Sequence, residues 1–259
     1  MIASLVLVAV CLAQTPDPVS PRDPQANADE KLARETFAAL REGRRDFRHL
    51  TAEYEQHRTT TLSRKPIVSS GQMSFRSDPG CLAFVVAKPK PARILLDEKR
   101  YQVYRPDTKQ MERFLLDDAR LSRALFDALA GRWSDLDAGF RLQSVARDAE
   151  QPRRVTIAFT PRDPDAKRTV AALSIVALLP DTGATAPAAA ELEQVGYVDA
   201  QGDRVEIRLR EIRLDGPLAE DVFVVEPPPG TKLLEHRARK PAPAPTPAPR
   251  VPRGDRDGR

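Results

Sequence analysis

The sequence predicts a mainly β protein of the α+β class: a single curved antiparallel sheet forming an incomplete barrel of about eleven strands, with helices as a lid. Short segments rich in β-branched and aromatic residues alternate with turn residues along most of the chain. Their connections have hairpin length, which favours antiparallel pairing. Two longer helical segments are too few to cover so large a sheet from outside, so we expect them inside its mouth.

The two ends of the chain differ in composition from the middle. Residues 1–13 are a short apolar run ending in small residues, which indicates a secretory signal peptide and a periplasmic location. No Lys or Arg precedes this run, and lipidation of Cys11 is the alternative. Residues 14–26 contain four prolines and are expected to be a linker, while residues 237–259 are expected to be a disordered tail rich in Pro and Arg. The folded domain is therefore expected over residues 27–236.

Charge and cysteine content narrow the function classes. The net charge is +4, but the chain from His236 onward holds seven Arg or Lys against two Asp, so the remainder is close to neutral. This distribution argues against nucleic acid as a partner. If the signal peptide is removed, Cys81 is the one cysteine left, which excludes an intramolecular disulfide. We expect Cys81 to be a small buried residue on a strand.

The domain is expected to open with a helix and continue as strands. Asn27 and Glu30 form a plausible capping pair, apolar residues recur at helical spacing from Leu32 to Leu40, and Gly43 ends the helix. The predicted strands follow in the order 50–62, 67–76, 81–87, 93–96, 101–105, 110–116, 140–146, 154–160, 170–179, 191–199 and 204–214.

A second helix interrupts the predicted strands over residues 118–130. Leu121, Leu125 and Leu129 lie on one of its faces, and Gly131 ends it. A short helical or turn segment is expected at residues 133–138. A last extended piece at residues 222–225 leads into Pro227-Pro228-Pro229-Gly230.

Several small motifs occur in a fixed order along the first strands. Tyr54 is followed by Gln56 in the first strand, and Gly71, Met73 and Phe75 precede the turn at Pro79 in the second. The later motifs are Lys88-Pro89, Ile94-Leu95-Leu96-Asp97, Tyr104-Arg105-Pro106, Gln110-Met111-Glu112 and the segment from Phe223 to Pro228-Pro229-Gly230. Their order and spacing over about residues 30–232 resemble the LolA family of periplasmic lipoprotein carriers.

This resemblance implies a carrier that binds the acyl chains of lipoproteins, or of lipids, in an apolar cavity and shuttles them from the inner to the outer membrane. It also implies an inner-membrane release complex and an outer-membrane acceptor as partners. We expect a monomer without a cofactor. The residues predicted to bind lipid are Tyr54, Met73, Phe75, Phe84, Tyr101, Val103, Leu121, Leu125 and Phe126.

The lid contact departs from the pattern of the family. In LolA proteins an arginine directly before the strand-ending proline holds the lid shut. Here Ser77 and Asp78 stand before Pro79, and Arg76 lies three residues upstream. Met73 and Phe75 share one face of a strand, so Arg76 points to the other face. Arg76 is nevertheless the candidate for locking the lid.

Acyl carriage has a simple physical basis. Burying one CH₂ group of an acyl chain in an apolar cavity is worth about 0.8 kcal/mol. If the protein's own helices partly fill that cavity, the cost of displacing them offsets this gain, and binding becomes reversible. Enzymatic functions are not indicated, because the three histidines lack metal-ligand spacing and no nucleophile or phosphate-binding motif occurs. Two alternatives are a sensor of lipids or lipoproteins built on the same scaffold, and a structural envelope protein anchored through Cys11.

Overall fold

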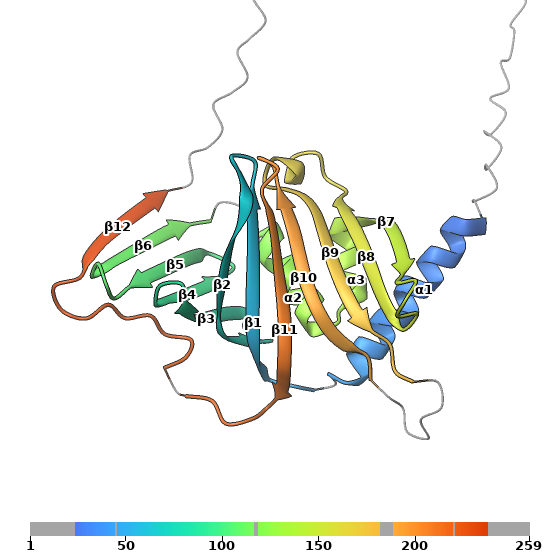
Figure 1. The fold of residues 1–259 in the computed structure, drawn as a ribbon, viewed down its shortest axis with the longest axis horizontal. Coiled ribbons are helices and arrows are strands. Elements are labelled where there is room, and N and C mark those ends of the chain that lie inside the picture. The colour runs from blue at the N-terminus through green and yellow to red at the C-terminus, as the bar shows by residue number, and fades with distance from the viewer. Residues whose placement is uncertain (1–23, 45, 117–118, 182–188, 220, 238–259) are drawn as a thin grey trace, which may run out of the picture.

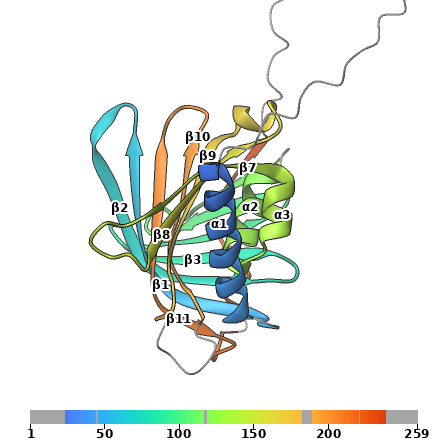
Figure 2. The ribbon, with the colours of Figure 1, turned by 90° about the vertical axis from the view of Figure 1, so that its right-hand side faces the viewer.

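The computed structural model describes residues 24–44, 46–116, 119–181, 189–219 and 221–237. The predicted signal peptide with Cys11, most of the predicted linker and the tail beyond Arg237 lie outside the described residues. The remaining chain forms one sheet with helices on one of its faces (Figures 1 and 2).

The sheet has twelve strands in the order β12-β6-β5-β4-β3-β2-β1-β11-β10-β9-β8-β7, and it is curved and unclosed (Figure 1). The strands are β1 (His49–Thr60), β2 (Ser63–Arg76), β3 (Cys81–Lys88), β4 (Ala92–Asp97), β5 (Arg100–Arg105), β6 (Gln110–Leu115), β7 (Phe140–Arg147), β8 (Arg154–Pro161), β9 (Val170–Leu178), β10 (Glu191–Asp199), β11 (Arg204–Leu214) and β12 (Lys232–Arg237). The eleven predicted strands correspond to β1–β11, so the predicted fold class is confirmed.

The helices cover the inner, concave face of the sheet (Figure 2). They are α1 (Pro24–Glu42), α2 (Arg120–Ala130) and α3 (Trp133–Gly139), and a short 3₁₀ turn spans Ala166–Arg168. α1 and α3 contact β7, and α2 contacts β10 and α3. The helices therefore lie mainly over the half of the sheet that contains β7–β10.

The prediction that the first helix starts near Asn27 was wrong by three residues. α1 begins at Pro24, inside the segment predicted to be a linker. Proline is tolerated in the first turn of a helix, where a backbone N–H has no helical partner, so Pro24 starts the helix without breaking it.

Large buried apolar side chains form the core, and most of them lie in the layer between the helices and the sheet. The largest of those that are less than 2% exposed come from α1, α2, α3 and from strands on both sides of β1. These side chains are Phe37, Phe75, Phe126, Phe159, Leu40, Leu50, Met73, Met111, Leu136, Ile157, Leu173 and Ile175. All of them except Met111 belong to one continuous cluster on the inner face.

A separate, smaller cluster lies on the outer face. Val225 is 8% exposed and packs with Cys81, Ala83, Leu95 and Met111. Val225 belongs to residues 215–231, which we call the outer strap. The strap explains why β3 is buried at five of its eight positions, on both of its faces.

The extended piece predicted at residues 222–225 is not a strand. Its backbone forms a turn and an irregular segment, and Val225 serves as an apolar cover over the outer face. The last strand is instead β12, which pairs in parallel with β6, with Lys232 opposite Gln110. The strap returns the chain to the start of β6, so β12 must run in the same direction as β6. The sheet is thus antiparallel except for this pair, and Arg237, predicted as the first residue of the tail, is the last residue of β12.

Candidate functional site

The inner face of the sheet brings together four of the residues predicted to bind lipid. Tyr54 on β1, Met73 and Phe75 on β2, and Phe84 on β3 are buried in the same cluster. β1 and β2 pair with Leu50 opposite Phe75, so their alternate side chains share one face. The rings of Tyr54 and Phe84 lie 4.8 Å apart in an edge-to-face arrangement. The structure therefore unites residues from three strands into one apolar surface.

Three tyrosines with raised pKa values lie on the inner face of the sheet. Burial raises the pKa of Tyr54 to about 12, although a hydrogen bond to Ser69 lowers it. Burial also raises the pKa of Tyr197 on β10 to about 12, and it raises the pKa of Tyr101 on β5. These three tyrosines stay neutral at physiological pH, so they add polarity to the inner face without adding charge.

Helix α2 supplies the other wall. Leu125 and Phe126 are buried, and Leu121 is half-buried against the same cluster. The ring of Phe126 lies 5.7 Å from that of Phe75. It also presses on Gly80, where an added Cβ would come within 2.6 Å of the ring. Phe126 thus packs α2 against the turn between β2 and β3. Position 80 in this turn has to be glycine, because a side chain there would clash with the Phe126 ring.

Tyr101 and Val103 lie further toward the β12 edge of the inner face. Val103 on β5 is buried opposite Ile94 of β4. The ring of Tyr101 lies 5.8 Å from Phe114 on β6, and Phe114 stacks on His236 of β12 at 4.5 Å. A role of Tyr101 and Val103 in lipid binding stays a prediction, as it does for the other seven residues.

The apolar space that we expected beneath the helices is occupied by the protein's own side chains. Phe37 of α1 contacts Trp133 of α3 at a ring distance of 5.0 Å and Phe159 of β8 at 6.1 Å. Phe37 and Phe159 are each 1% exposed. A ligand can occupy this layer only if some of the side chains that fill it move aside.

A cleft of about 680 Å³, which we call the mouth, opens where α2 meets the sheet. Its walls are the turn between β2 and β3, the hairpin between β4 and β5, and the outer side of α2. Phe126 lies at its apolar floor. The charged residues that line the mouth are Arg76, Asp78, Asp97, Glu98, Lys99, Arg100, Arg123, Asp127, Arg132 and Asp135.

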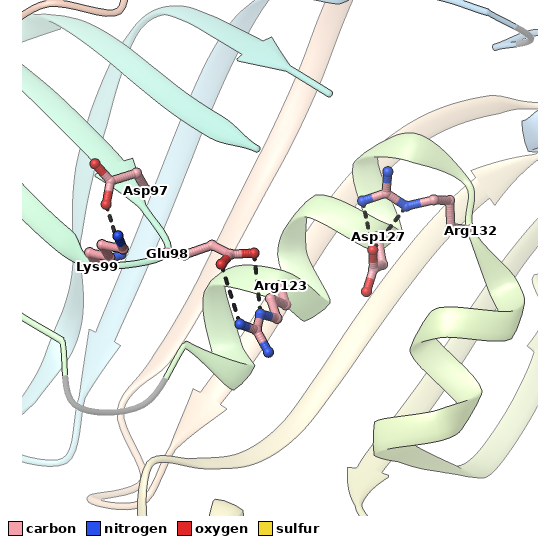
Figure 3. A network of polar contacts seen from close by, with 6 residues as sticks. All are labelled: Asp97, Glu98, Lys99, Arg123, Asp127 and Arg132. Carbon is pink, nitrogen blue, oxygen red and sulfur yellow. Dashed lines mark hydrogen bonds and ion pairs between the residues drawn. The ribbon is translucent and has the colours of Figure 1, made fainter. Parts of the chain in front are cut away.

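An ion pair connects α2 to the sheet across the mouth (Figure 3). Arg123 donates from Nε and Nη2 to the two carboxylate oxygens of Glu98, at 3.2 and 3.3 Å. The two side chains are 61% and 47% exposed, and exposed pairs contribute at most about 1 kcal/mol. No local pattern in the sequence predicts this pair, because the hairpin and the helix are distant in sequence and only the fold makes them neighbours.

A second pair in Figure 3 lies at the end of α2. Arg132 donates to Asp127 Oδ1 at 2.8 and 3.0 Å. Burial raises the pKa of Asp127, and the hydrogen bond from Arg132 lowers it again. This pair belongs to the helical layer itself and holds α2 to the start of α3. Glu98 and Arg123 connect α2 to the β4–β5 hairpin, and Arg120 of α2 donates to Asp163, in the segment after β8, at 2.7 Å.

The structure places Arg76 on the outer side of the mouth. Its guanidinium lies 4.9 Å from the ring centre of Phe223 in the outer strap, and its Nε donates to the carbonyl oxygen of Pro79 at 3.3 Å. These contacts tie Arg76 to the strap and the β2–β3 turn. A role as the lock on the helices stays a prediction, whereas the ion pair across the mouth is made by Glu98 and Arg123.

Two features of the described residues concern metal ions and membranes. Within the described ranges, no group of three or more His, Cys, Asp or Glu side chains is arranged to hold a metal ion. Among the helices that the structure describes, none has the length and apolarity needed to cross a membrane.

Comparison with known proteins identifies the family. The model of the family described as outer membrane lipoprotein carrier protein LolA matches residues 45–226. Because this match covers more than half of the chain, the chain belongs to this family. Comparison with curated proteins finds no match.

Solved structures provide further likenesses. An uncharacterised conserved protein from Thermus thermophilus is similar at a TM-score of 0.42 and 12% identity, covering 79% of this chain and 99% of that one. LprF from Mycobacterium bovis is similar at a TM-score of 0.38 and 17% identity, with coverages of 74% and 96%. The lipoprotein LppX from Mycobacterium tuberculosis is similar at a TM-score of 0.39 and 9% identity, with coverages of 73% and 98%.

Proposed function

We propose that the protein binds acyl chains of lipoproteins or lipids between α2 and the inner face of the sheet, and carries them from the inner to the outer membrane. Membership of the LolA family supports this role. The observation that carries it is the seat of α2: its buried face, with Leu125, Phe126 and Leu129, rests on the apolar inner face of the sheet, and Phe126 contacts Phe75 and Gly80. The polar connection across the mouth is an exposed ion pair.

The energies fit reversible binding. Exposing one buried leucine or phenylalanine costs about 1.5–3 kcal/mol, and α2 buries three of them, Leu125, Phe126 and Leu129. Breaking an exposed ion pair adds at most about 1 kcal/mol. Burying each CH₂ of an incoming acyl chain returns about 0.8 kcal/mol, so about ten methylene groups offset the displacement of α2. When the acyl chain leaves, the displaced side chains of α2 return to the sheet. The free energy regained in this way lowers the net affinity of the protein for the acyl chain and permits its transfer.

The rest of the proposal follows from the family. The protein acts in the periplasm as a monomer, receives its cargo from an inner-membrane release complex and delivers it to an outer-membrane acceptor. It acts as a carrier and not as an enzyme. The nine residues predicted to bind lipid would line the opened space, with Tyr54, Met73, Phe75 and Phe84 on the sheet side and Leu121, Leu125 and Phe126 on the helix side.

The proposal is tested by binding of a fluorescent fatty-acyl probe to the full-length chain purified without detergent. Phe126→Ala removes the side chain that a ligand must displace, so we expect binding to tighten by about tenfold. Val85→Ala is the matched control, because Val85 is 42% exposed on β3 and faces away from the helices. Absence of saturable binding to wild type, together with no acyl lipid in the purified protein, would refute the proposal.

A further inference from the structure

The sheet is split at one place. β10 and β11 pair only from Gln194 opposite Arg208 to Val198 opposite Arg204. Beyond that point β10 continues along β9 as far as Glu191, and β11 continues along β1 as far as Leu214. The two strands diverge toward the end of α1, as Figure 1 shows. The divergence leaves a cleft of about 570 Å³, which we call the β10–β11 cleft.

A buried arginine lies in this cleft. Arg44 follows the last turn of α1 and is only 7% exposed. Its Nη1 donates to the carbonyl oxygen of Leu40 at 3.3 Å, while its Nε is buried without a hydrogen-bond partner. Burial lowers the pKa of Arg44 to about 10, so the side chain is still charged at neutral pH. A buried charge without a counter-ion is costly, and an anion in the cleft would relieve that cost.

The carboxylates around the cleft do not neutralise Arg44. Glu193 accepts from Arg154 at 2.6 Å, and Glu211 accepts from Arg213 at 3.2 Å. Glu191 and Arg210 are exposed at the rim and carry opposite charges. Within the part of the chain that the structure describes, Arg44 has no ion-pair partner, so the cleft retains a positive charge in its interior.

The same cleft reaches the apolar core. Leu192 and Leu209, which line it, are 1% and 7% exposed and belong to the cluster beneath the helices. Ala190 lines it too and is a member of the same cluster. A cation set beside an opening into an apolar core matches one kind of ligand: an anionic head attached to an apolar chain.

We propose that the β10–β11 cleft is a second opening, which binds the anionic headgroup of a single-chain amphiphile through Arg44 while the chain enters the apolar core. The headgroup chemistry is a carboxylate or a phosphate, both of which match the guanidinium fork. The path of the chain rests on the proposed acyl-binding function, whereas headgroup recognition rests on the cleft and Arg44. Arg44 also caps α1 through its hydrogen bond to Leu40. A side chain that only caps the helix predicts other outcomes in the test below than one that binds the headgroup.

The test uses the full-length protein and three ligands of equal chain length: laurate, dodecyl phosphate and dodecanol. Calorimetric titration measures how much more tightly the two anions bind than the uncharged alcohol. We expect a ratio of at least about tenfold, the value of one charge-assisted hydrogen bond. The larger of the two anion ratios identifies a carboxylate or a phosphate as the preferred headgroup.

Variants then assign this preference to one side chain. Arg44→Met should reduce the anion-to-alcohol ratio to about one, and Arg44→Lys should retain part of it. Arg41→Met is the matched control, because Arg41 is an exposed arginine in the last turn of the same helix, and it should keep the full ratio. Thermal unfolding provides a second readout. If Arg44 only caps α1, Arg44→Met should lower the stability of the protein and leave the anion-to-alcohol ratio unchanged. That result would overturn the proposal.

The two proposals fail in different ways. If none of the three ligands binds, the acyl-binding function fails together with this inference. If all three bind with equal affinity, the acyl-binding function survives and the headgroup site is refuted. If Arg44→Met does not fold, the ratio for Arg44→Lys decides, because an unchanged ratio in that variant shows that the guanidinium fork is not the ligand.

Discussion

The two halves of the sheet are covered in different ways. β7–β10 bury their inner face under α1, α2 and α3. β3–β6 are covered on the outer face by the strap, which packs Val225 over Cys81, Leu95 and Met111. Each apolar face of a sheet needs a cover, but the two covers differ in how they are held. The strap joins two strands of the sheet and is fixed at both ends, whereas α2 is held by the packing of Leu125, Phe126 and Leu129 and by exposed ion pairs.

The largest effect is expected in the half beneath the helices. Phe159 on β8 is 1% exposed and contacts the rings of Phe37 and Trp133. Phe159→Ala should reduce the free energy of unfolding by about 3–5 kcal/mol, because it leaves a cavity in a packed layer. Urea unfolding measures this change in free energy. Thr156→Ala, at an exposed position of the same strand, should stay within about 0.5 kcal/mol. Equal effects of the two changes would mean that this half is not close-packed.

The outer strap gives the next largest effect. Met111 on β6 is fully buried beneath the strap, and Met111→Ala should cost about 2–5 kcal/mol of stability. Since Met111 faces away from the helices, the affinity for a fatty-acyl probe should not change. Leu115→Ala on the same strand, 39% exposed, is the control. A large change in probe affinity for Met111→Ala would contradict the separation of the two covers.

Gly80 tests the seat of α2. Gly80→Ala places a methyl group against the ring of Phe126, so we expect a loss of about 1–3 kcal/mol in stability and faster probe binding through a loosened α2. Gly139→Ala is the matched control, because a Cβ there meets nothing within 4 Å. Stopped-flow fluorescence measures the binding rate. Slower binding in Gly80→Ala would show that the seat of α2 is not the gate.

A smaller effect is expected for the ion pair across the mouth. Glu98→Gln should change the free energy of unfolding by less than about 1 kcal/mol and accelerate probe binding modestly. The difference from wild type should disappear near 1 M salt, where the Debye length falls to about 3 Å. Glu35→Gln removes another exposed pair, with Lys31 on α1, and should leave the rate unchanged. A rate difference that persists at high salt would exclude the electrostatic explanation.

The smallest effect concerns the anchor of the strap. Backbone hydrogen bonds from His49 and Arg48 lower the pKa of Asp215, which begins the strap beside β1. Because the folded-state pKa lies below the unfolded value of about 3.9, the carboxylate stabilises the fold above that pH. This contribution is lost as the pH falls through the folded-state pKa. The difference in urea midpoint between wild type and Asp215→Asn should therefore shrink from pH 6 to pH 3, and a constant difference would contradict the linkage.

Local patterns were sufficient to predict most of the sheet. Period-two alternation and turn residues located β1–β11, and apolar spacing located α1 and α2. The order of small motifs identified the family before any contact was known. These features are encoded within short segments, and tertiary packing does not override them here.

What the sequence did not predict depends on contacts between distant segments. Val225 alternates like a strand residue, yet it covers Cys81 and Met111, and no local signal distinguishes a cover from a strand. β12 carries charged residues among its apolar ones and is held by its parallel pairing with β6. No local signal distinguishes Arg44, because an arginine after a helix-ending glycine is ordinary and its burial comes from the packing of residues 189–190 against α1.

The location of the acyl chain is tested most directly by a photo-cross-linking amino acid placed at Leu125 in cells. Leu125 lies on the buried face of α2, and the matched position Val85 lies on the exposed outer face of β3. We predict that position 125 captures a lipid or lipoprotein through its acyl chain, identified by mass spectrometry, and that position 85 does not. Capture of no acyl-bearing species at 125, or of the same species at both positions, would contradict binding beneath α2.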